Sequence, residues 1–431
     1  AHYGECVEAA LFTEFAAEQS ERESAEDADA KAAATAVAAA LFVAFDKKYC
    51  GEEDIHVCVD RLELENGHAE TVLRGYYKAQ SVYLRSSGSV TKTRALKPAL
   101  FGTAGHRLLG MFGGQGGVDN YIEETRMLYA TYRPLVSDYV ACMSEFLQQE
   151  AGEAAFSQVY RKGLDVVAWL ESDEEVPDQE YMLSVPVSIP VVGLTQLMQV
   201  MVLFKTLGIS PGELASSFEA IAGHSQGIAT ATALSLATDE ESFYRVSKIV
   251  LGLLMLTGVY PQLDYPTAAA SAQSIAATPM VSVLKLSRAQ IAEAISKHNA
   301  QQKTDKAMVH LSLTNGAKMF VVSGATESIK GFVRALYKEH DTGGADQTRV
   351  RHSQRKSGVS TKYLSINAPY HCPLLGHAVE GACRYASSKG WELDSRDMRR
   401  AVRAGDDGHD IRGVGNLSQY LLQSMCVLPV D

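Results

Sequence analysis

IAGHSQGIATATAL, residues 221–234, is the stretch of sequence that decides the fold, because residues 223–227 read G-x-S-x-G. The preceding SFEAIA is typical of a short strand, and the small residues of IATATALSLA favour a closely packed helix. A strand, a sharp turn and a helix around this motif form a nucleophile elbow, which exposes the serine hydroxyl. Gly223 and Gly227 would let two backbones pass where side chains clash. The pattern predicts Ser225 as a nucleophile in an α/β fold.

A serine hydroxyl is a weak nucleophile at neutral pH, so a base must lie within hydrogen-bond reach. The best candidate is His371 in NAPYHCPLL, which follows a strand-like run and Pro369. Its alternative interpretation is a surface or buried structural histidine. A metal site formed with Cys372 is disfavoured, since no further ligands stand at a usable spacing. We therefore expect a serine–histidine pair and no metal.

A second glycine-rich turn, GMFGGQGG at residues 110–117, follows an apolar run. It matches neither G-x-G-x-x-G nor G-x-x-x-x-G-K-[ST], so the sequence does not support nucleotide binding. Its backbone amides can instead supply half of an oxyanion hole, facing the amide of Gln226.

Composition limits the classes of function. The 431 residues carry a net charge of −11, with 46% hydrophobic and 21% charged residues, which is ordinary for a globular protein. An acidic protein is a poor nucleic-acid partner. Seven scattered cysteines favour a reducing compartment, so we expect the cytosol. The apolar run 32–45 is too short for a bilayer span, and we expect no membrane association.

Three parts are expected along the chain. Residues 1–100 are rich in Ala and Glu and predict a mostly helical N-terminal region. Residues 101–279, together with 368–431, predict an α/β core. Residues 280–367 predict an inserted ferredoxin-like unit of order β-α-β-β-α-β. The ends AHY and CVLPVD suggest a piece of a longer polypeptide.

Local signals support the inserted unit. Ser287 and Gln290 form a capping box before a helix. VHLSLT and MFVVSGA are strand-like and are joined by Asn315-Gly316, which predicts a hairpin turn. A polar loop before the last strand, KYLSIN, carries a basic cluster. This cluster is either a solvated loop or a clamp for phosphates or an acidic carrier, and its cations are Arg349, Arg351, Arg355 and Lys356.

The motifs FGGQG, GHSQG and APYH, in this order around an inserted unit, resemble the acyl-carrier-protein acyltransferase family. The segments GEEDIHVCVDRL, MFGGQGGVDNYIEETRMLYATYRPLVSD and LSLTNGAKMFVVSG resemble more narrowly the acetyltransferase domain of the β subunit of fungal-type fatty acid synthase. The resemblance runs from about residue 35 to the end. It implies an acyltransferase fold with an α/β-hydrolase-like parallel-sheet core.

The resemblance implies a two-step transfer. Ser225 would take acetyl from acetyl-coenzyme A, and the phosphopantetheine thiol of acyl carrier protein would then receive it, with His371 as the base. The amides of Gln115 and Gln226 would hold the oxyanion, and a backbone carbonyl would orient the base. No cofactor would be bound by the domain itself, and its partners would be acyl carrier protein and other synthase domains or subunits. The substrate-binding residues would be Gly114, His224, Thr257, Asn315 and Tyr370.

Thr257 stands where malonyl-type relatives carry an arginine that pairs with the substrate carboxylate, so the resemblance implies a neutral acyl group. Two positions depart from the fungal pattern, namely Tyr370 in place of Phe and Tyr260 in place of Arg. Three alternatives stay open: a serine thioesterase or hydrolase, a starter-unit or other acyl-coenzyme A transacylase, and a catalytically silent part of the synthase shell. The basic loop would bind coenzyme A or the carrier.

Overall fold

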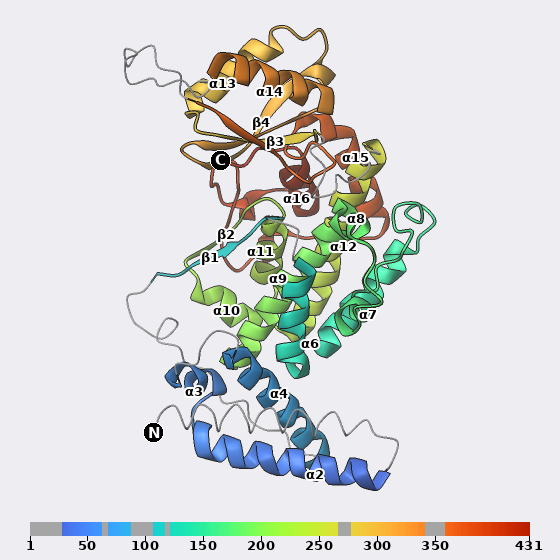
Figure 1. Cartoon of the computed structure of the whole chain (residues 1–431), viewed down its shortest axis with the longest axis vertical. Coiled ribbons are helices and arrows are strands. Elements are labelled where there is room, and N and C mark those ends of the chain that lie inside the picture. The colour runs from blue at the N-terminus through green and yellow to red at the C-terminus, as the bar shows by residue number, and fades with distance from the viewer. Residues whose placement is uncertain (1–27, 63–67, 88–106, 117–120, 266–276, 341–357) are drawn as a thin grey trace.

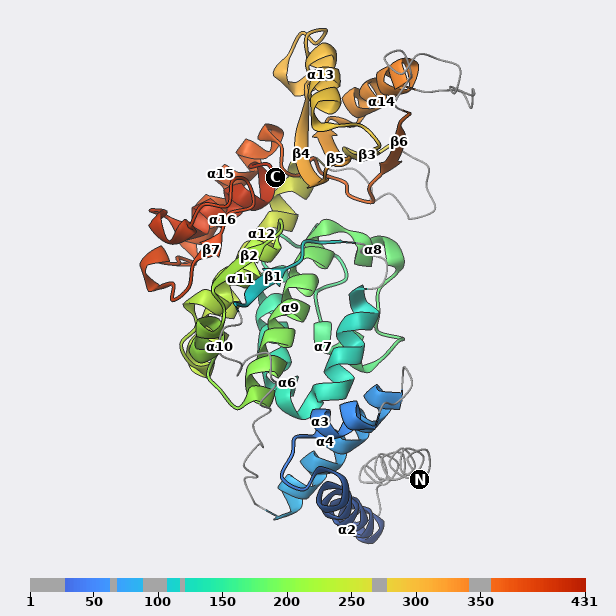
Figure 2. The same cartoon turned by 90° about the vertical axis from the view of Figure 1, so that its left-hand side faces the viewer.

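The computed structural model describes residues 28–62, 68–87, 107–116, 121–265, 277–340 and 358–431. Figures 1 and 2 show an elongated chain, with the N-terminal helices at one end and the inserted unit at the other. The described cysteines are all free thiols. The buried hydrophobic residues form three separate clusters. One lies in the N-terminal helices, one in the α/β core and one in the inserted unit. The exact domain boundaries at residues 100, 280 and 367 stay a prediction.

The described part of the N-terminal region, residues 28–62 and 68–87, is mostly helical, as predicted. Phe42, Phe45, Tyr76 and Tyr77 form the aromatic centre of its core. Asp54 accepts a hydrogen bond from the His56 amide and so caps a short helix. The elements are α2 (Ala28–Phe45), a π-helical turn η1 (Asp46–Cys50), α3 (Ile55–Arg61) and α4 (His68–Ser87).

A parallel sheet of order β1-β2-β7 forms the frame of the middle part, consistent with the predicted α/β core. Its strands are β1 (Leu109–Phe112), β2 (Ala220–Gly223) and β7 (Val402–Arg403), and Phe112 pairs with Gly223. The surrounding helices are α6 (Tyr121–Ala151), α7 (Val166–Glu171), α8 (Gln179–Leu183), α9 (Val185–Leu207), α10 (Pro211–Ser217), α11 (Gly227–Leu236), α12 (Glu240–Asp264), α15 (Gly376–Ser388) and α16 (Leu417–Cys426). Short 3-10 turns are η2 (Asp305–Ala307), η4 (Pro373–Leu375), η5 (Ser395–Asp397) and η6 (Ile411–Gly413).

Two helices, α9 and α12, are long and apolar enough to cross a membrane by length and composition alone. They pack against each other, and 72% of the apolar window of each is buried inside the protein. Burial on this scale is typical of core helices, whose apolar surface is removed from water by their neighbours.

The inserted unit has the predicted order β-α-β-β-α-β, folded as an antiparallel sheet β4-β5-β3-β6. The predicted Ser287/Gln290 capping box is present. The predicted hairpin is present between β4 and β5, but its turn is not at Asn315 and Gly316, which end the strand β4; Ala317 and Lys318 make the turn. The elements are β3 (Met280–Leu284), α13 (Arg288–Asn299), β4 (Val309–Gly316), β5 (Met319–Gly324), α14 (Thr326–His340) and β6 (Ser360–Tyr363).

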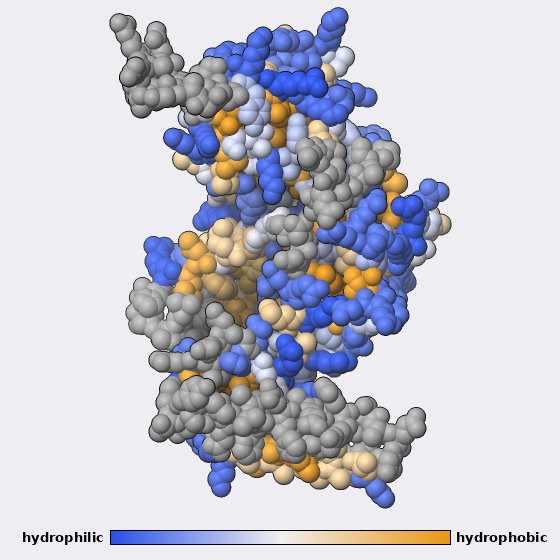
Figure 3. Space-filling model, viewed as in Figure 1, coloured by the Kyte–Doolittle hydropathy of each residue, from blue (hydrophilic) through white to orange (hydrophobic). Residues whose placement is uncertain are grey.

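The visible surface differs between the inserted unit and the middle of the molecule (Figure 3). In Figure 3 the helices α13 and α14 carry mainly hydrophilic side chains, whereas hydrophobic side chains gather near β1. Leu109 and Met111 of this edge strand are 67% and 71% exposed. The parallel sheet therefore lies close to the surface, and residues at the ends of its strands can be reached from solvent.

Candidate active site

Ser225 lies on the predicted elbow between β2 and α11. Its φ angle is 53°, in the left-handed region that non-glycine residues rarely adopt. A Cβ atom at Gly223 would lie 2.1 Å from the Ile228 nitrogen, and one at Gly227 would lie 2.4 Å from the Phe112 oxygen. Only glycine fits at both positions, so the turn can hold Ser225 in this conformation.

The predicted base lies against the predicted nucleophile. The Ser225 Oγ to His371 Nε2 distance is 2.8 Å, and His371 Nδ1 lies 2.7 Å from the Leu428 carbonyl oxygen. A carbonyl can only accept, so Nδ1 carries the proton and Nε2 is left as the acceptor. The serine hydroxyl therefore donates to His371, which is the arrangement that a general base needs.

Burial keeps His371 neutral. The residue is 3% exposed, and loss of hydration on burial lowers its pKa to about 4, with a smaller electrostatic effect of nearby His224 in the same direction. The hydrogen bond to Leu428 opposes this shift but does not cancel it. At neutral pH the imidazole is free to accept a proton.

The segment after α16 holds the carbonyl that orients His371. Val430 pairs with Leu313 of β4, since its amide donates to Ser312 O at 2.9 Å and its carbonyl accepts from the Thr314 amide at 2.8 Å. Leu428 lies two residues before this bridge. The orientation of the base therefore depends on contact between this segment and the inserted unit. Sequence reasoning did not find Leu428, because a backbone carbonyl has no residue-type signal.

A cavity of about 370 Å³ opens at the serine, between the core and the inserted unit. The part of its lining that the structure describes contains no Lys, Arg, Asp or Glu side chain. Sequence reasoning missed its apolar walls, which include Ile189, Leu313 and Met425. All nine residues predicted for the reaction and the substrate line this cavity: Gly114, Gln115, His224, Ser225, Gln226, Thr257, Asn315, Tyr370 and His371.

The glycine-rich loop lies directly against the elbow. A Cβ atom at Gly114 would meet His224 Nδ1 at 2.8 Å, so a glycine is needed for this approach. The His224 amide donates to Phe112 O at 2.9 Å, and the Gln115 side chain donates to Ser188 Oγ at 2.8 Å. Among the described residues, the amides of Gln115 and Gln226 donate to no other backbone group. These two amides are therefore available to bind an oxyanion.

The other residues predicted to bind the substrate are held in place by hydrogen bonds. His224 Nε2 lies 3.2 Å from Asn315 Oδ1, which joins the elbow to β4. The Tyr370 hydroxyl donates to the Thr257 carbonyl at 2.8 Å. The Thr257 hydroxyl donates to the carbonyl of Leu253, one turn earlier in the same helix. The hydroxyl that distinguishes Tyr370 from Phe is thus satisfied inside the helix α12. Tyr260 does not line the cavity and packs against Phe156.

The position of the basic cluster relative to the cavity is not described. Its residues Arg349, Arg351, Arg355 and Lys356 lie outside the described residues. Asp406, Asp407 and His409 are the described residues whose ligand atoms cluster within 4.8 Å, as a metal site would require. None of the three lines the reaction cavity.

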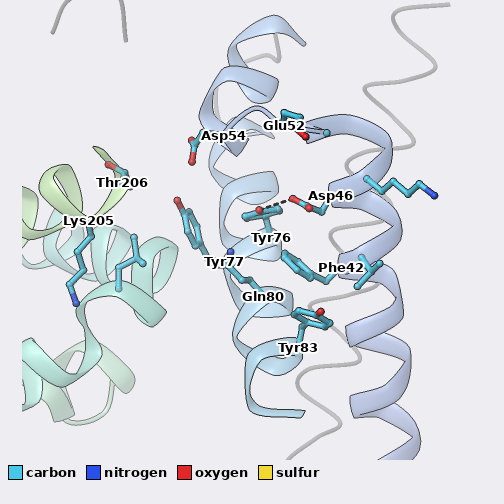
Figure 4. Close-up of a pocket in the computed structure, with 14 residues that line it drawn as sticks. Phe42, Asp46, Glu52, Asp54, Tyr76, Tyr77, Gln80, Tyr83, Lys205 and Thr206 are labelled. Atoms are coloured by element: carbon cyan, nitrogen blue, oxygen red, sulfur yellow. Dashed lines mark hydrogen bonds between the residues drawn. The ribbon is translucent and has the colours of Figure 1, made fainter. Parts of the chain in front are cut away.

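A second cavity, of about 440 Å³, lies between the N-terminal helices and α9 (Figure 4). Phe42, Tyr76 and Tyr83 project into it, and the Tyr76 hydroxyl donates to Asp46 at 3.0 Å. In Figure 4, Tyr77 lies on the side of α4 toward Lys205 and Thr206, whereas Phe42, Tyr76 and Tyr83 lie between α4 and α2. The residues of its lining that the structure describes include no histidine, cysteine or serine, and so no counterpart to the Ser225–His371 pair.

Comparison with known proteins shows the family of the chain. Residues 110–371 match the family described as starter unit:ACP transacylase in aflatoxin biosynthesis. The β subunit of fatty acid synthase from Saccharomyces cerevisiae is 31% identical over 401 residues, covering 90% of this chain and 19% of that protein. The Schizosaccharomyces pombe subunit is 36% identical over 340 residues, covering 77% and 16%.

Among solved structures, a malonyl-transacylase in complex with the acyl carrier protein of a type II polyketide synthase has a TM-score of 0.48. Its identity is 17%, and the match covers 76% of this chain and 82% of that chain. The chain spans less than a fifth of the length of the two yeast relatives. Because the family match covers most of the described chain and includes both Ser225 and His371, the chain belongs to the starter unit:ACP transacylase family.

Proposed function

We propose that this chain is the acetyltransferase of a multifunctional fatty acid synthase. It would move acetyl from acetyl-coenzyme A, through an ester on Ser225, to the phosphopantetheine thiol of acyl carrier protein. The observation that carries the proposal is the 2.8 Å contact between Ser225 Oγ and a neutral, buried His371 inside a cavity with an uncharged described lining. The similarity to fungal synthase β subunits supports the same assignment.

In the first half-reaction, Ser225 Oγ attacks the thioester carbonyl while His371 Nε2 takes the hydroxyl proton. The carbonyl oxygen becomes an oxyanion, which the amides of Gln115 and Gln226 stabilise; one such donor contributes about 10²–10³ in rate. The carbon–sulfur bond then breaks, and His371 returns its proton to the leaving thiolate. A protonated imidazole with a pKa of about 4 is a strong acid toward a thiolate, so expulsion is favoured.

The second half-reaction reverses these roles. The phosphopantetheine thiol gives its proton to His371 and attacks the acyl-serine carbonyl. The carbon–oxygen bond breaks, and Ser225 Oγ takes the proton back from His371. One thioester is exchanged for another, so the step needs no external energy source. The cytosolic location, acetyl-coenzyme A and acyl carrier protein all stay predictions for this chain.

The lining of the cavity favours a neutral acyl group. A malonyl group would bring a carboxylate among the apolar walls with no described cation to pair with it, and an uncompensated buried charge costs several kcal/mol. Thr257, which is 2% exposed, uses its hydroxyl in a bond to Leu253. The Thr257 side chain therefore cannot substitute for an arginine.

A panel of acyl-coenzyme A esters tests the proposal. We expect acetyl and propionyl esters to add one acyl group to the chain, and malonyl ester to react about 10²-fold more slowly, following the cost of an unpaired charge. Propionyl and malonyl are a matched pair, since they differ by a methyl group in place of a carboxylate. The rate is read as intact mass against time after rapid mixing. Equal rates for propionyl and malonyl esters would show that the neutral-acyl assignment is wrong.

A further inference from the structure

A glutamine of the helix α9 is hydrogen-bonded to both segments that carry the proposed oxyanion donors. Gln196 Nε2 donates to the Gly113 carbonyl at 2.7 Å, and Gln196 Oε1 accepts from the Thr230 hydroxyl at 2.7 Å. Gly113 lies two residues before Gln115 in the glycine-rich loop. Thr230 lies four residues after Gln226, on α11. One side chain therefore joins the loop to the helix that follows the elbow.

The chemistry of its two partners fixes which way the Gln196 amide points. A carbonyl oxygen can only accept, so the Gly113 oxygen must face the NH₂ group. The other end of the amide is an acceptor, and the Thr230 hydroxyl supplies the hydrogen. Thr230 is fully buried, and its hydroxyl also lies 3.0 Å from the Gly227 oxygen at the start of α11. A single orientation of the Gln196 amide thus satisfies both contacts.

The elements around Gln196 are packed together. The helix α11 packs against both α9 and β1, and Figure 2 shows these three elements side by side. A second contact ties the loop to α9, because the Gln115 side chain donates to Ser188 Oγ at 2.8 Å. Ser188 and Gln196 are eight residues apart, which is about two turns, or about 12 Å, along the helix. The loop is held to α9 at two points, and Gln196 extends this connection to α11.

Gln196 acts at a distance from the substrate. Neither Gln196 nor Gly113 is among the described residues that line the cavity at Ser225, whereas Gln115 and Gln226 both line it. Gln196 can therefore affect the reaction only through the positions of the two backbone amides. Such donors stabilise charge that develops in the transition state. A displacement of about 1 Å can lower a rate by about 10²-fold.

We propose that Gln196 is a positioning residue, which sets the separation between the amide of Gln115 and the amide of Gln226. The inference rests on the proposed acyl transfer, because it concerns the oxyanion of that reaction. With Gln196 in place, the loop and α11 are held as one unit, and both amides point at the same oxygen. Without it, the loop keeps its contacts with α9 and β2 but loses its side-chain connection to α11.

Two substitutions separate positioning from packing. Gln196→Met keeps the length of the side chain and removes both hydrogen bonds. Gln196→Glu keeps the shape and an acceptor for Thr230, but its ionised form cannot donate to Gly113. The matched control is Gln199→Glu, because Gln199 is an exposed glutamine of the same helix. Stopped-flow acetylation of Ser225 in the 431-residue chain, across acetyl-coenzyme A concentrations, gives the maximal rate and the half-saturating concentration.

We expect Gln196→Met to lower the maximal rate by about tenfold or more, since misplaced groups lose catalysis steeply. The half-saturating concentration should stay within about twofold of the wild type, because an interaction made only in the transition state does not change substrate binding. Circular dichroism should show the same fold in all variants.

Gln196→Glu adds a dependence on pH that a packing role would not produce. At pH 8 the variant should be as slow as Gln196→Met. At pH 5 its rate relative to the wild type should rise at least about threefold, because a glutamate with a pKa of about 4.3, or higher beside a carbonyl oxygen, is partly protonated and can again donate to Gly113. Gln199→Glu should follow the wild type at both pH values.

A maximal rate of Gln196→Met equal to that of the wild type would overturn the proposal. So would a loss that appears entirely as a higher half-saturating concentration, or a Gln196→Glu rate whose ratio to the wild type is the same at pH 8 and pH 5. Failure of the proposed function itself has a different signature, since the wild type would then not be acetylated at Ser225.

Discussion

Ser225→Ala protein should take up no acyl group from acetyl-coenzyme A under conditions in which the wild type is fully labelled. The variant lacks the Ser225 Oγ atom, which lies 2.8 Å from His371 Nε2. Removing the nucleophile of a serine–histidine pair lowers the rate by about 10⁶. Intact mass and peptide mapping after exposure to acetyl-coenzyme A measure the result.

Ser296→Ala is a matched control, because Ser296 is an exposed serine of α13. It should be labelled like the wild type. Stable labelling of Ser225→Ala at wild-type rate would mean that another residue is the nucleophile, and the assignment of the elbow would fail.

His371→Ala should acylate about 10⁴-fold more slowly, since it removes the general base while leaving Ser225 in place. The wild-type rate should also stay nearly constant from pH 8 down to pH 5. Only neutral imidazole accepts the proton, and a pKa of about 4 leaves about 97% of His371 neutral at pH 5.5. An ordinary histidine would be only about 9% neutral there. Stopped-flow acylation across this pH range measures both effects.

His377→Ala is the control for this prediction, because His377 is exposed on α15, with 78% of its side chain accessible. Its rate and pH profile should equal those of the wild type. A wild-type midpoint near pH 6.5 would contradict the buried, neutral state of His371. Acylation of His371→Ala at more than about a tenth of the wild-type rate would remove its role as the base.

Local patterns predicted the elbow because its determinants are local. The two glycines act on atoms within a few residues or on the adjoining strand, as the 2.1 Å and 2.4 Å approaches at Gly223 and Gly227 show. The capping box at Ser287 is equally short-range. Such features are visible in a window of a few residues.

Features that depend on contacts between residues far apart in the sequence could not be predicted from local patterns. The carbonyl that orients His371 belongs to Leu428, 57 residues away, and its identity depends on the pairing of Val430 with β4. The hairpin turn was misplaced because a register shift between Thr314 and Gly316 moves the turn to Ala317 and Lys318. Arg74 of α4 and Arg133 of α6 line one groove, and only the packing of the two helices brings these positions together.

The geometry of the site depends on contacts with the inserted unit. The sequence motifs do not indicate these contacts. β4 supplies Asn315 to His224, and the backbone around Ser312 and Thr314 holds Val430, near the carbonyl that orients the base. The reaction cavity is closed on one side by residues of β3 and β5. A group bound in the cavity therefore contacts both parts of the protein.

The most direct test of the account is the fate of the acyl group on Ser225. The acyl-enzyme is isolated after exposure to acetyl-coenzyme A and is then mixed with pantetheine. The products, acetyl-pantetheine and free acetate, are quantified by mass spectrometry. The account predicts that the thiol receives nearly all of the acetyl group, with slow release of acetate in its absence. Release of free acetate as the main product, whether or not the thiol is present, would identify a hydrolase and contradict the proposed transfer.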